Sequence, residues 1–262
     1  EINRAKEELK QAEEELAREL LIKIHDQLEG LKIRQVGSLE RSENLHIKIM
    51  KRKIWTDAFL DTIEGNMEAQ KSISEETDVF KEKLKEAKVF HSLLEKAKDS
   101  MDKAVKVMDI RREEGKDRRE NKFNDAEIKD ENEWHLDTVK HQKVALAKLD
   151  RLLDALKDEI KKPKKPRDLA KQEDPMQPPK EPEGGMQPRD GIPPTAQLKV
   201  LRAEQLDLNQ QTEDFAKRNP DLTKLNEDQQ RELMELSQEQ ERIHDLFRAL
   251  FPPPQPLKEG DP

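Results

Sequence analysis

Apolar residues recur at alternating steps of three and four along two long stretches of the chain. The first stretch steps through Ala87, Phe90, Leu94, Ala97, Met101, Ala104 and Met108, and the second through Val139, Gln142, Leu146, Leu149, Leu153, Leu156 and Ile160. On an α-helix this spacing forms one narrow stripe, which is the pattern of a coiled-coil seam. The pattern predicts long amphipathic helices that pack side by side.

A third stripe opens the chain and changes register near residue 20. It runs through Ile2, Ala5, Leu9, Ala12 and Leu16, and then through Leu21, Ile24, Leu28 and Leu31. Such shifts are typical of helices in hairpins or bundles rather than in one uninterrupted two-stranded rope. We therefore expect an all-α protein, built either as an elongated coiled coil or as a bundle of helical hairpins.

Glycines are the only candidate breaks before residue 163, because this part of the chain contains no proline. The pattern predicts helices at 1–34, 38–68, 73–112 and 124–161, with turns near Gly37, near Gly65 and around Gly115. Ser72 and Glu75 have the spacing of a capping box for the third helix. Residues 1–162 are interpreted as one unit of helices in coiled-coil or hairpin packing.

Prolines divide the rest of the chain. Nine of the 15 prolines fall within 163–194, and five more follow from Pro252 onward. Proline disrupts both helices and sheet ladders, so 163–194 is predicted to be a proline-rich disordered linker and 252–262 a proline-rich tail. Between them, 195–251 is predicted to form a two-helix hairpin. Its first helix ends before Pro220, and Asn226 with Gln229 caps its second helix.

Composition narrows the classes of protein that fit. Only 32% of the residues are hydrophobic and 41% are charged, so a thick core cannot be filled, whereas helices that bury a narrow stripe are possible. The net charge of −8 argues against nucleic acid as a partner. No apolar run reaches the ~20 residues that a membrane span needs. A chain starting at Glu1 without methionine is interpreted as a processed product or a fragment, which leaves room for membrane contact through flanking segments.

Candidate chemistry is sparse. Two Glu-x-x-His pairs, Glu43 with His46 and Glu241 with His244, have the spacing found in di-iron helix bundles, but one such pair is expected by chance and the two lie on opposite sides of the linker. We therefore predict no metal, no cofactor and no catalytic residues. The basic run KKPKKPR from Lys161 is interpreted as the solvated start of the linker rather than as a nuclear import signal or a phosphate contact.

The order of the segments resembles a family. The segments are WTDAFLDTIEGNMEAQKSISEE, VFHSLLEKAKDSMDKAVKVM and HQKVALAKLDRLLDALK, followed by the proline-rich break and by LKVLRAEQLDLNQQTEDF. They are similar to the coiled-coil portion of large uncharacterised bacterial cell-envelope proteins of the planctomycete type. The resemblance implies a bacterial envelope or periplasmic setting and carries no catalytic residues.

The first functional hypothesis is a non-enzymatic structural or scaffolding protein that associates with other proteins, either itself or a larger envelope protein, through apolar helix stripes. The alternative is a membrane-associated helical regulatory segment of a larger bacterial envelope protein. The predicted partner-binding residues are Phe90, Leu94, Met101, Met108, Leu146, Leu149, Leu153, Leu156, Leu233, Leu236, Ile243, Phe247 and Leu250.

Overall fold

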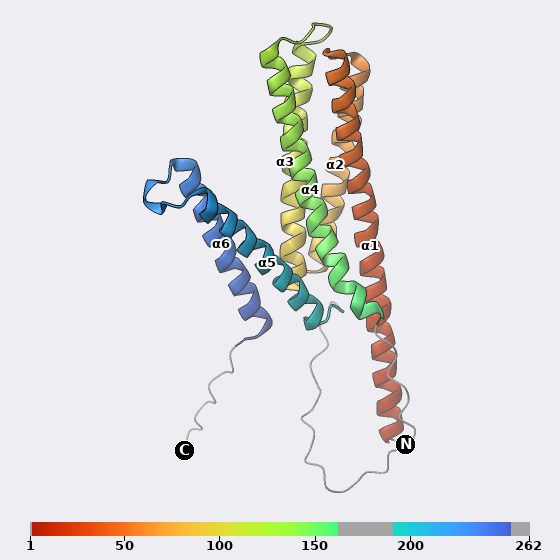
Figure 1. Ribbon diagram of the computed structural model, residues 1–262. Helices are drawn as coiled ribbons and strands as arrows, with labels where there is room; N and C mark the ends of the chain where they lie inside the picture. The colour runs from red at the N-terminus through yellow and green to blue at the C-terminus, as the bar shows by residue number, and fades with distance from the viewer. Residues whose placement is uncertain (1, 162–190, 253–262) are drawn as a thin grey trace, which may run out of the picture.

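A computed structural model describes residues 2–161 and 191–252, and the expected all-α class is confirmed (Figure 1). The described helices are α1 (Ile2–Arg52), α2 (Asp57–Lys83), α3 (Lys88–Asp117), α4 (Asp125–Lys161), α5 (Pro194–Arg218), the short 3₁₀-helix η1 (Leu222–Lys224) and α6 (Glu227–Leu250). The predicted linker falls almost entirely outside the described residues, as does the predicted tail. No described helix is long and apolar enough to cross a membrane.

Helices α1 to α4 form an antiparallel bundle, in which consecutive helices are neighbours and α4 returns beside α1 (Figure 1). Helix α1 has 51 residues, about 76 Å at 1.5 Å per residue, and is much longer than its neighbours. Its N-terminal end therefore projects beyond the bundle (Figure 1). We refer to Ile2–Leu16 as the α1 extension, and every residue in it is exposed.

Two of the predicted turns are wrong. Gly37 lies inside α1 and Gly65 inside α2, and the chain reverses instead at residues 53–56 and 84–87. A glycine within a helix costs only about 1 kcal/mol, which the packing of a long buried stripe outweighs. The capping box predicted at Ser72 is wrong for the same reason, because Ser72 lies in the middle of α2.

The reversal between α1 and α2 has a side-chain cap that the positions of the glycines do not reveal. Thr56 caps α2 by accepting a hydrogen bond from the Phe59 amide, and Lys53 takes a positive φ of 53° as α1 ends. At the same end of the bundle, the amide of Glu120 donates to the carbonyl of Trp55 at 3.0 Å. This contact joins the α1–α2 turn to the α3–α4 connection, where the predicted break after Gly115 does occur.

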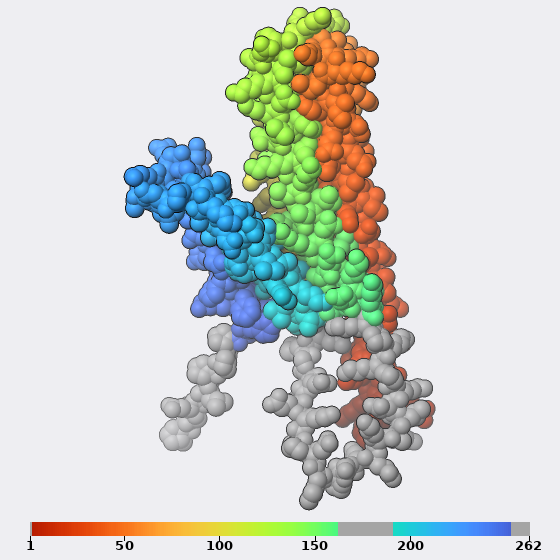
Figure 2. All heavy atoms as spheres, in the orientation of Figure 1, coloured from red at the N-terminus to blue at the C-terminus, as the bar shows by residue number. Residues whose placement is uncertain are grey.

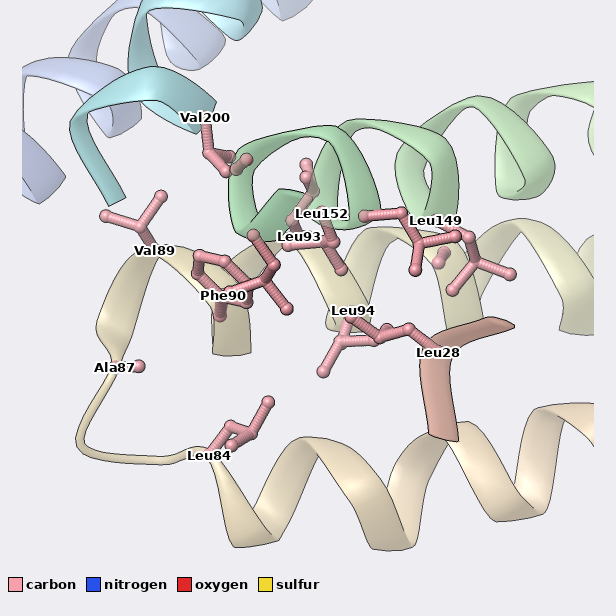
Figure 3. Close-up of a cluster of buried hydrophobic side chains, with 14 of the residues drawn as sticks. Leu28, Leu84, Ala87, Val89, Phe90, Leu93, Leu94, Leu149, Leu152 and Val200 are labelled. Atoms are coloured by element: carbon pink, nitrogen blue, oxygen red, sulfur yellow. The ribbon is translucent and has the colours of Figure 1, made fainter. Parts of the chain in front are cut away.

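The seams predicted on α3 and α4 face the interior of the bundle. Figure 3 shows Phe90, Leu93 and Leu94 of α3 against Leu149 and Leu152 of α4, with side chains of α1 and α5 closing the cluster. All five side chains are almost completely inaccessible to solvent. Because burial of each such side chain contributes roughly 1.5–3 kcal/mol, this interior is the main source of stability.

A layer of buried polar side chains crosses the middle of the bundle. Gln35 of α1, Gln70 of α2 and Gln142 of α4 are completely buried, and Gln70 Nε2 donates to Gln35 Oε1 at 2.7 Å. Ser38 donates to Gln70 and accepts from Gln142, each at 3.0 Å. Polar residues in a seam are satisfied in only one alignment of the helices, so we interpret this layer as a device that sets their register.

Helices α5 and α6 lie side by side and contact the α3–α4 side of the bundle (Figure 1). The capping box predicted at Asn226 is present, since Asn226 Oδ1 accepts from the Gln229 amide and the Gln229 side chain accepts from the Asn226 amide, both at 2.9 Å. Val200, Leu201 and Leu208 of α5 join the main hydrophobic cluster, whereas α6 contributes only Ile243 as a fully buried residue.

Candidate functional site

The structure places most of the predicted partner-binding residues inside the protein itself. Eight of them are buried among the helices: Phe90, Leu94, Met101, Met108, Leu149, Leu153, Leu156 and Ile243. Three are half-buried: Leu146, Leu236 and Leu250. Only Leu233 and Phe247 on α6 are exposed, at 37% and 49%. The stripes of α3 and α4 are therefore covered by neighbouring helices of the same chain and are not available to another protein.

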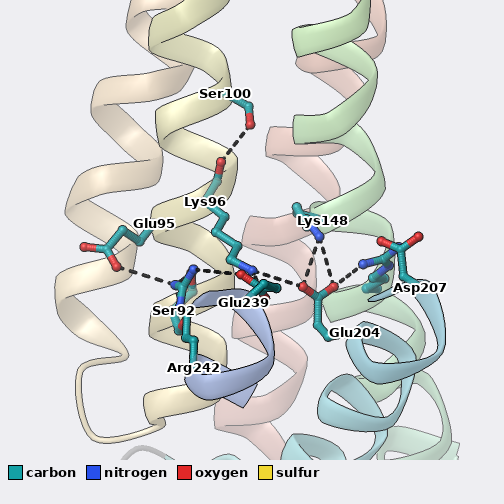
Figure 4. A network of polar contacts seen from close by, with 10 residues as sticks. Ser92, Glu95, Lys96, Ser100, Lys148, Glu204, Asp207, Glu239 and Arg242 are labelled. Atoms are coloured by element: carbon teal, nitrogen blue, oxygen red, sulfur yellow. Dashed lines mark hydrogen bonds and ion pairs between the residues drawn. The ribbon is translucent and has the colours of Figure 1, made fainter. Parts of the chain in front are cut away.

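The joint between α5 and the bundle is built on one carboxylate. Glu204 of α5 is 7% exposed and lies beside Lys148 of α4 and Lys96 of α3 (Figure 4). Arg151 of α4 is its third cationic neighbour. Lys148 Nζ donates to both carboxylate oxygens, at 3.1 and 3.0 Å, Arg151 donates to Oε1, and Lys96 Nζ lies 3.5 Å from Oε2. Three cations around one buried carboxylate make this joint specific for an acid at position 204.

Burial and charge act in opposite directions on the groups of this joint. Burial alone would raise the pKa of Glu204, but the ammonium of Lys148 and the guanidinium of Arg151 outweigh it and hold that pKa below its usual value. Burial lowers the pKa of the Lys148 ammonium, and the attraction of Glu204 only partly offsets this effect. The joint is thus an ion cluster that holds α5 in place.

A second set of contacts attaches α6 to α3. The Arg242 guanidinium donates to the carbonyl of Ser92 at 2.8 Å and to its hydroxyl, and lies 3.7 Å from Glu95 (Figure 4). Glu239 pairs with Lys96, which also faces Glu204. Since so few of the α6 side chains are buried, these polar contacts are a large share of what holds α6 against the bundle.

Beyond the joint the hairpin leans away from the bundle and leaves a cleft (Figure 2). The cleft has a volume of about 580 Å³, and its lining includes Lys140 and Lys148 of α4, Asp207 of α5 and Glu235 and Leu236 of α6. Asp207 is paired with Arg151 at 2.7 Å, and Lys148 is held by Glu204. The cleft offers charged and apolar surface, but its lining shows no pair of groups arranged as a nucleophile and its base.

A cluster of ionisable groups is buried near the far end of the bundle. The rings of His46 on α1 and His135 on α4 are stacked, with centroids 3.8 Å apart, and His46 Nδ1 lies 3.5 Å from Glu131 Oε1. Glu131 also pairs with Arg111 of α3, and both side chains are 1% exposed. The Arg111 guanidinium lies 5.7 Å from the centroid of the buried Trp55 ring.

The environment of this cluster favours the neutral form of His135 and the charged form of Glu131. Burial, and then the nearby His46 and Arg111, lower the pKa of His135 to about 4. Burial opposes ionisation of Glu131, but His46 and Arg111 outweigh it and lower the Glu131 pKa. The apolar pattern of the sequence did not predict this cluster. The signal was present, because Arg111 extends the three-and-four stepping that ends at Met108, and a polar residue at a seam position indicates a buried partner.

The Glu-x-x-His pairs do not come together as a metal site. Glu43 lies 3.5 Å from Lys143, and His244 lies 4.0 Å from its neighbour Asp245, both on or near the surface. Within residues 2–161 and 191–252, no group of three or more histidine or carboxylate side chains has an arrangement that could hold a metal ion.

Exposed large apolar residues are scattered over the bundle, but on the α1 extension and on the hairpin they also lie in line or next to one another. On the α1 extension Ile2, Leu9 and Leu16 are 74%, 61% and 61% exposed. On the hairpin, Phe247 and Phe251 lie next to each other, with ring centroids 5.3 Å apart, and are about half exposed. Exposed apolar side chains that lie in a row indicate a surface that associates with something else.

Comparison with known proteins does not narrow these possibilities. No protein-family model, no curated protein and no solved structure matches this chain.

Proposed function

We propose that this protein is a non-enzymatic structural or scaffolding protein, in which the helical bundle is a stiff spacer and the α1 extension is the surface that joins a protein partner. One observation carries the proposal: the extension presents a regular stripe of exposed apolar residues, Ile2, Leu9 and Leu16, on a helix that continues from the bundle. The apolar stripes of α3 and α4, in contrast, are already covered by the chain's own helices.

The physical cost of an uncovered extension supports a partner. An isolated helix of about 15 residues is marginally stable in water, because nucleation is unfavourable and each added residue contributes little. Every residue of the extension is exposed, whereas α1 is buried against its neighbours at regular positions from Leu21 onward. A partner that covers the stripe would stabilise the helix and remove apolar surface from water.

The charged groups beside the hairpin support a structural role rather than catalysis. Across the joint, the carboxylates of Glu204 and Asp207 are neutralised by the cations of Lys148 and Arg151. The energetic effect of these groups is therefore to dock α5 on the bundle. A catalytic acid or base is instead expected to have a free proton-transfer position facing a substrate. The proposed setting is the bacterial cell envelope, and it is supported only by the resemblance in the order of the sequence segments.

Site-specific photo-crosslinking in cells that produce the full-length protein tests the function. A photoreactive phenylalanine analogue at position 9 lies on the stripe, whereas the same analogue at position 7 lies on the opposite face of α1. We expect a discrete protein adduct from position 9 and none from position 7. If neither position gives a protein adduct, or if both give the same unspecific products, the extension does not join a protein and the proposal fails.

A further inference from the structure

The stripe of the α1 extension has the spacing of a short coiled coil with alternating large and small residues. Ile2, Leu9 and Leu16 repeat every seven residues, and Ala5 and Ala12 stand between them. Large and small residues alternate along the seam, so a matching helix must offer a small residue opposite each leucine for close packing. This requirement restricts the occupant far more than exposed apolar surface alone would.

The stripe is not a continuation of the face that α1 buries in its own bundle. The last residue of the stripe, Leu16, is followed by Leu21 as the first buried residue, a step of five instead of three or four. At 3.6 residues per turn, this step places Leu21 about 140° around the helix from Leu16, whereas steps of three or four stay within about 60°. The extension therefore presents its stripe in a different direction from the contacts with α2 and α4, and an occupant can reach it beside the bundle.

The sequence of the extension is complementary to itself in an antiparallel pair. With Leu16 opposite Ala5 of a second copy, Leu9 falls opposite Ala12, and the twofold axis repeats both pairings. Each leucine of the stripe then faces an alanine, and Ile2, at the end of the seam, lies opposite Glu19 of the second copy. In a parallel pair in register, leucine would face leucine and alanine would face alanine along the whole seam, which leaves gaps beside the alanines.

The charges beside the stripe distinguish the two arrangements. Lys6 and Glu13 occupy the same flank of the stripe, and in an antiparallel pair this flank faces its own copy, so Lys6 lies near Glu13 of the second copy twice over. On the other flank of the antiparallel pair Glu8 lies near Glu15 of the second copy, and in a parallel pair Glu8 would face Glu13. Like charges therefore meet in either arrangement, and the orientation rests on the packing of leucine against alanine. We infer that the α1 extension is a self-association site, which binds the extension of a second copy of this chain in antiparallel orientation. This inference rests on the proposed function, because it identifies the partner of that same surface.

The expected affinity is modest. A paired segment of 15 residues is about 22 Å long and makes an interface below the standard size, so we expect a dissociation constant on the order of 10 µM. Sedimentation equilibrium of the full chain over concentrations around this value should show a monomer–dimer equilibrium. Leu9→Glu should weaken dimerisation at least about tenfold, whereas Glu7→Gln, a change on the opposite face, should leave it unchanged. Because every residue from 2 to 16 is exposed, circular dichroism of both variants should retain the bundle's helical signal.

Two further sets of variants test orientation and charge. The chain has no cysteine, so Ala5→Cys and Leu16→Cys introduce the only thiols. A mixture of these two single variants should form a disulfide-linked dimer under mild oxidation, and neither should do so alone, because only the antiparallel pair brings positions 5 and 16 together. Lys6→Glu should weaken the dimer, and Lys6→Glu combined with Glu13→Lys should restore it.

The outcomes separate this inference from the proposed function. A purified chain that stays monomeric throughout the concentration range, a dimer unaffected by Leu9→Glu, or disulfide formation within single variants would each overturn the antiparallel pair. If the chain is monomeric but position 9 still crosslinks to a different protein in cells, the inference fails and the proposed function stands. If position 9 gives no protein adduct at all, the proposed function fails as well.

Discussion

Replacing single glycines by alanine should have opposite effects at two places in the bundle. An alanine is about 1 kcal/mol more favourable than glycine within a helix. At Gly65, a Cβ atom would meet nothing within 4 Å, so Gly65→Ala should raise the free energy of unfolding by about 0.5–1 kcal/mol. At Gly115, a Cβ atom would lie 2.7 and 2.8 Å from ring carbons of Trp55, which is closer than such atoms can approach.

Trp55 has little room to retreat from an alanine at position 115. Its side chain is 1% exposed, its ring faces the Arg111 guanidinium, and its carbonyl accepts from the Glu120 amide. Overpacking of a close-packed site typically costs about 1–3 kcal/mol, which exceeds the gain in helix propensity near the end of α3. We therefore expect Gly115→Ala to lower the free energy of unfolding by up to about 2 kcal/mol.

Urea unfolding followed by circular dichroism compares the two variants with the parent protein. The difference between Gly65→Ala and Gly115→Ala should be about 1–3 kcal/mol, in favour of Gly65→Ala. In a Trp55→Leu background the ring that an alanine at position 115 would meet is absent, so Gly115→Ala should no longer lower the free energy of unfolding. If Gly115→Ala is as stable as Gly65→Ala in the parent background, the Trp55 ring can move away from position 115 and the reasoning is refuted.

Two further predictions concern the buried charges. Because the pKa of His135 is about 4 in the folded protein against 6.5 unfolded, the unfolded state binds the proton first, and the free energy of unfolding should fall by about 1–2 kcal/mol, after allowing for solvent screening, as pH drops from 6.5 toward 4. Urea midpoints at several pH values measure this loss, which His135→Phe should abolish; an unchanged loss in that variant would assign it to other groups. Glu204→Gln leaves three cations facing a neutral amide and should weaken docking of the hairpin by about 2–4 kcal/mol. Hydrogen exchange should then accelerate in α5 and α6 but not in α2, whereas Glu213→Gln, on the exposed side of α5, should change neither, and equal protection in Glu204→Gln would contradict the role of the joint.

The helical nature of the protein followed from local patterns. The three-and-four stepping of α3 and α4 predicted long helices. Such a stripe predicts a helix whichever surface later buries it, because helical periodicity depends only on neighbouring residues. The Asn226 cap was predicted for the same reason, since its partners lie within three residues. The register shift near residue 20 also marked the point where α1 enters the bundle.

Tertiary contacts decided what the local patterns left open. Turns were predicted at Gly37 and Gly65 because the free-energy cost of a glycine in a helix is a local property. The packing that keeps both residues helical comes from α2, α3 and α4. The sequence alone allowed the α3 and α4 stripes to bind another protein, and only the closed bundle shows that they face each other.

The buried ion clusters depended on the fold for a similar reason. Glu204 and Lys148 are 56 residues apart, and His46 and His135 are 89 apart, so no local pattern links them, and the charges become a site only when the helices meet. By itself the sequence determined where helices form and which face of each is apolar, because those properties arise from neighbouring residues. The tertiary structure decided which faces are covered within the chain and which remain free, because burial depends on residues that are distant in sequence.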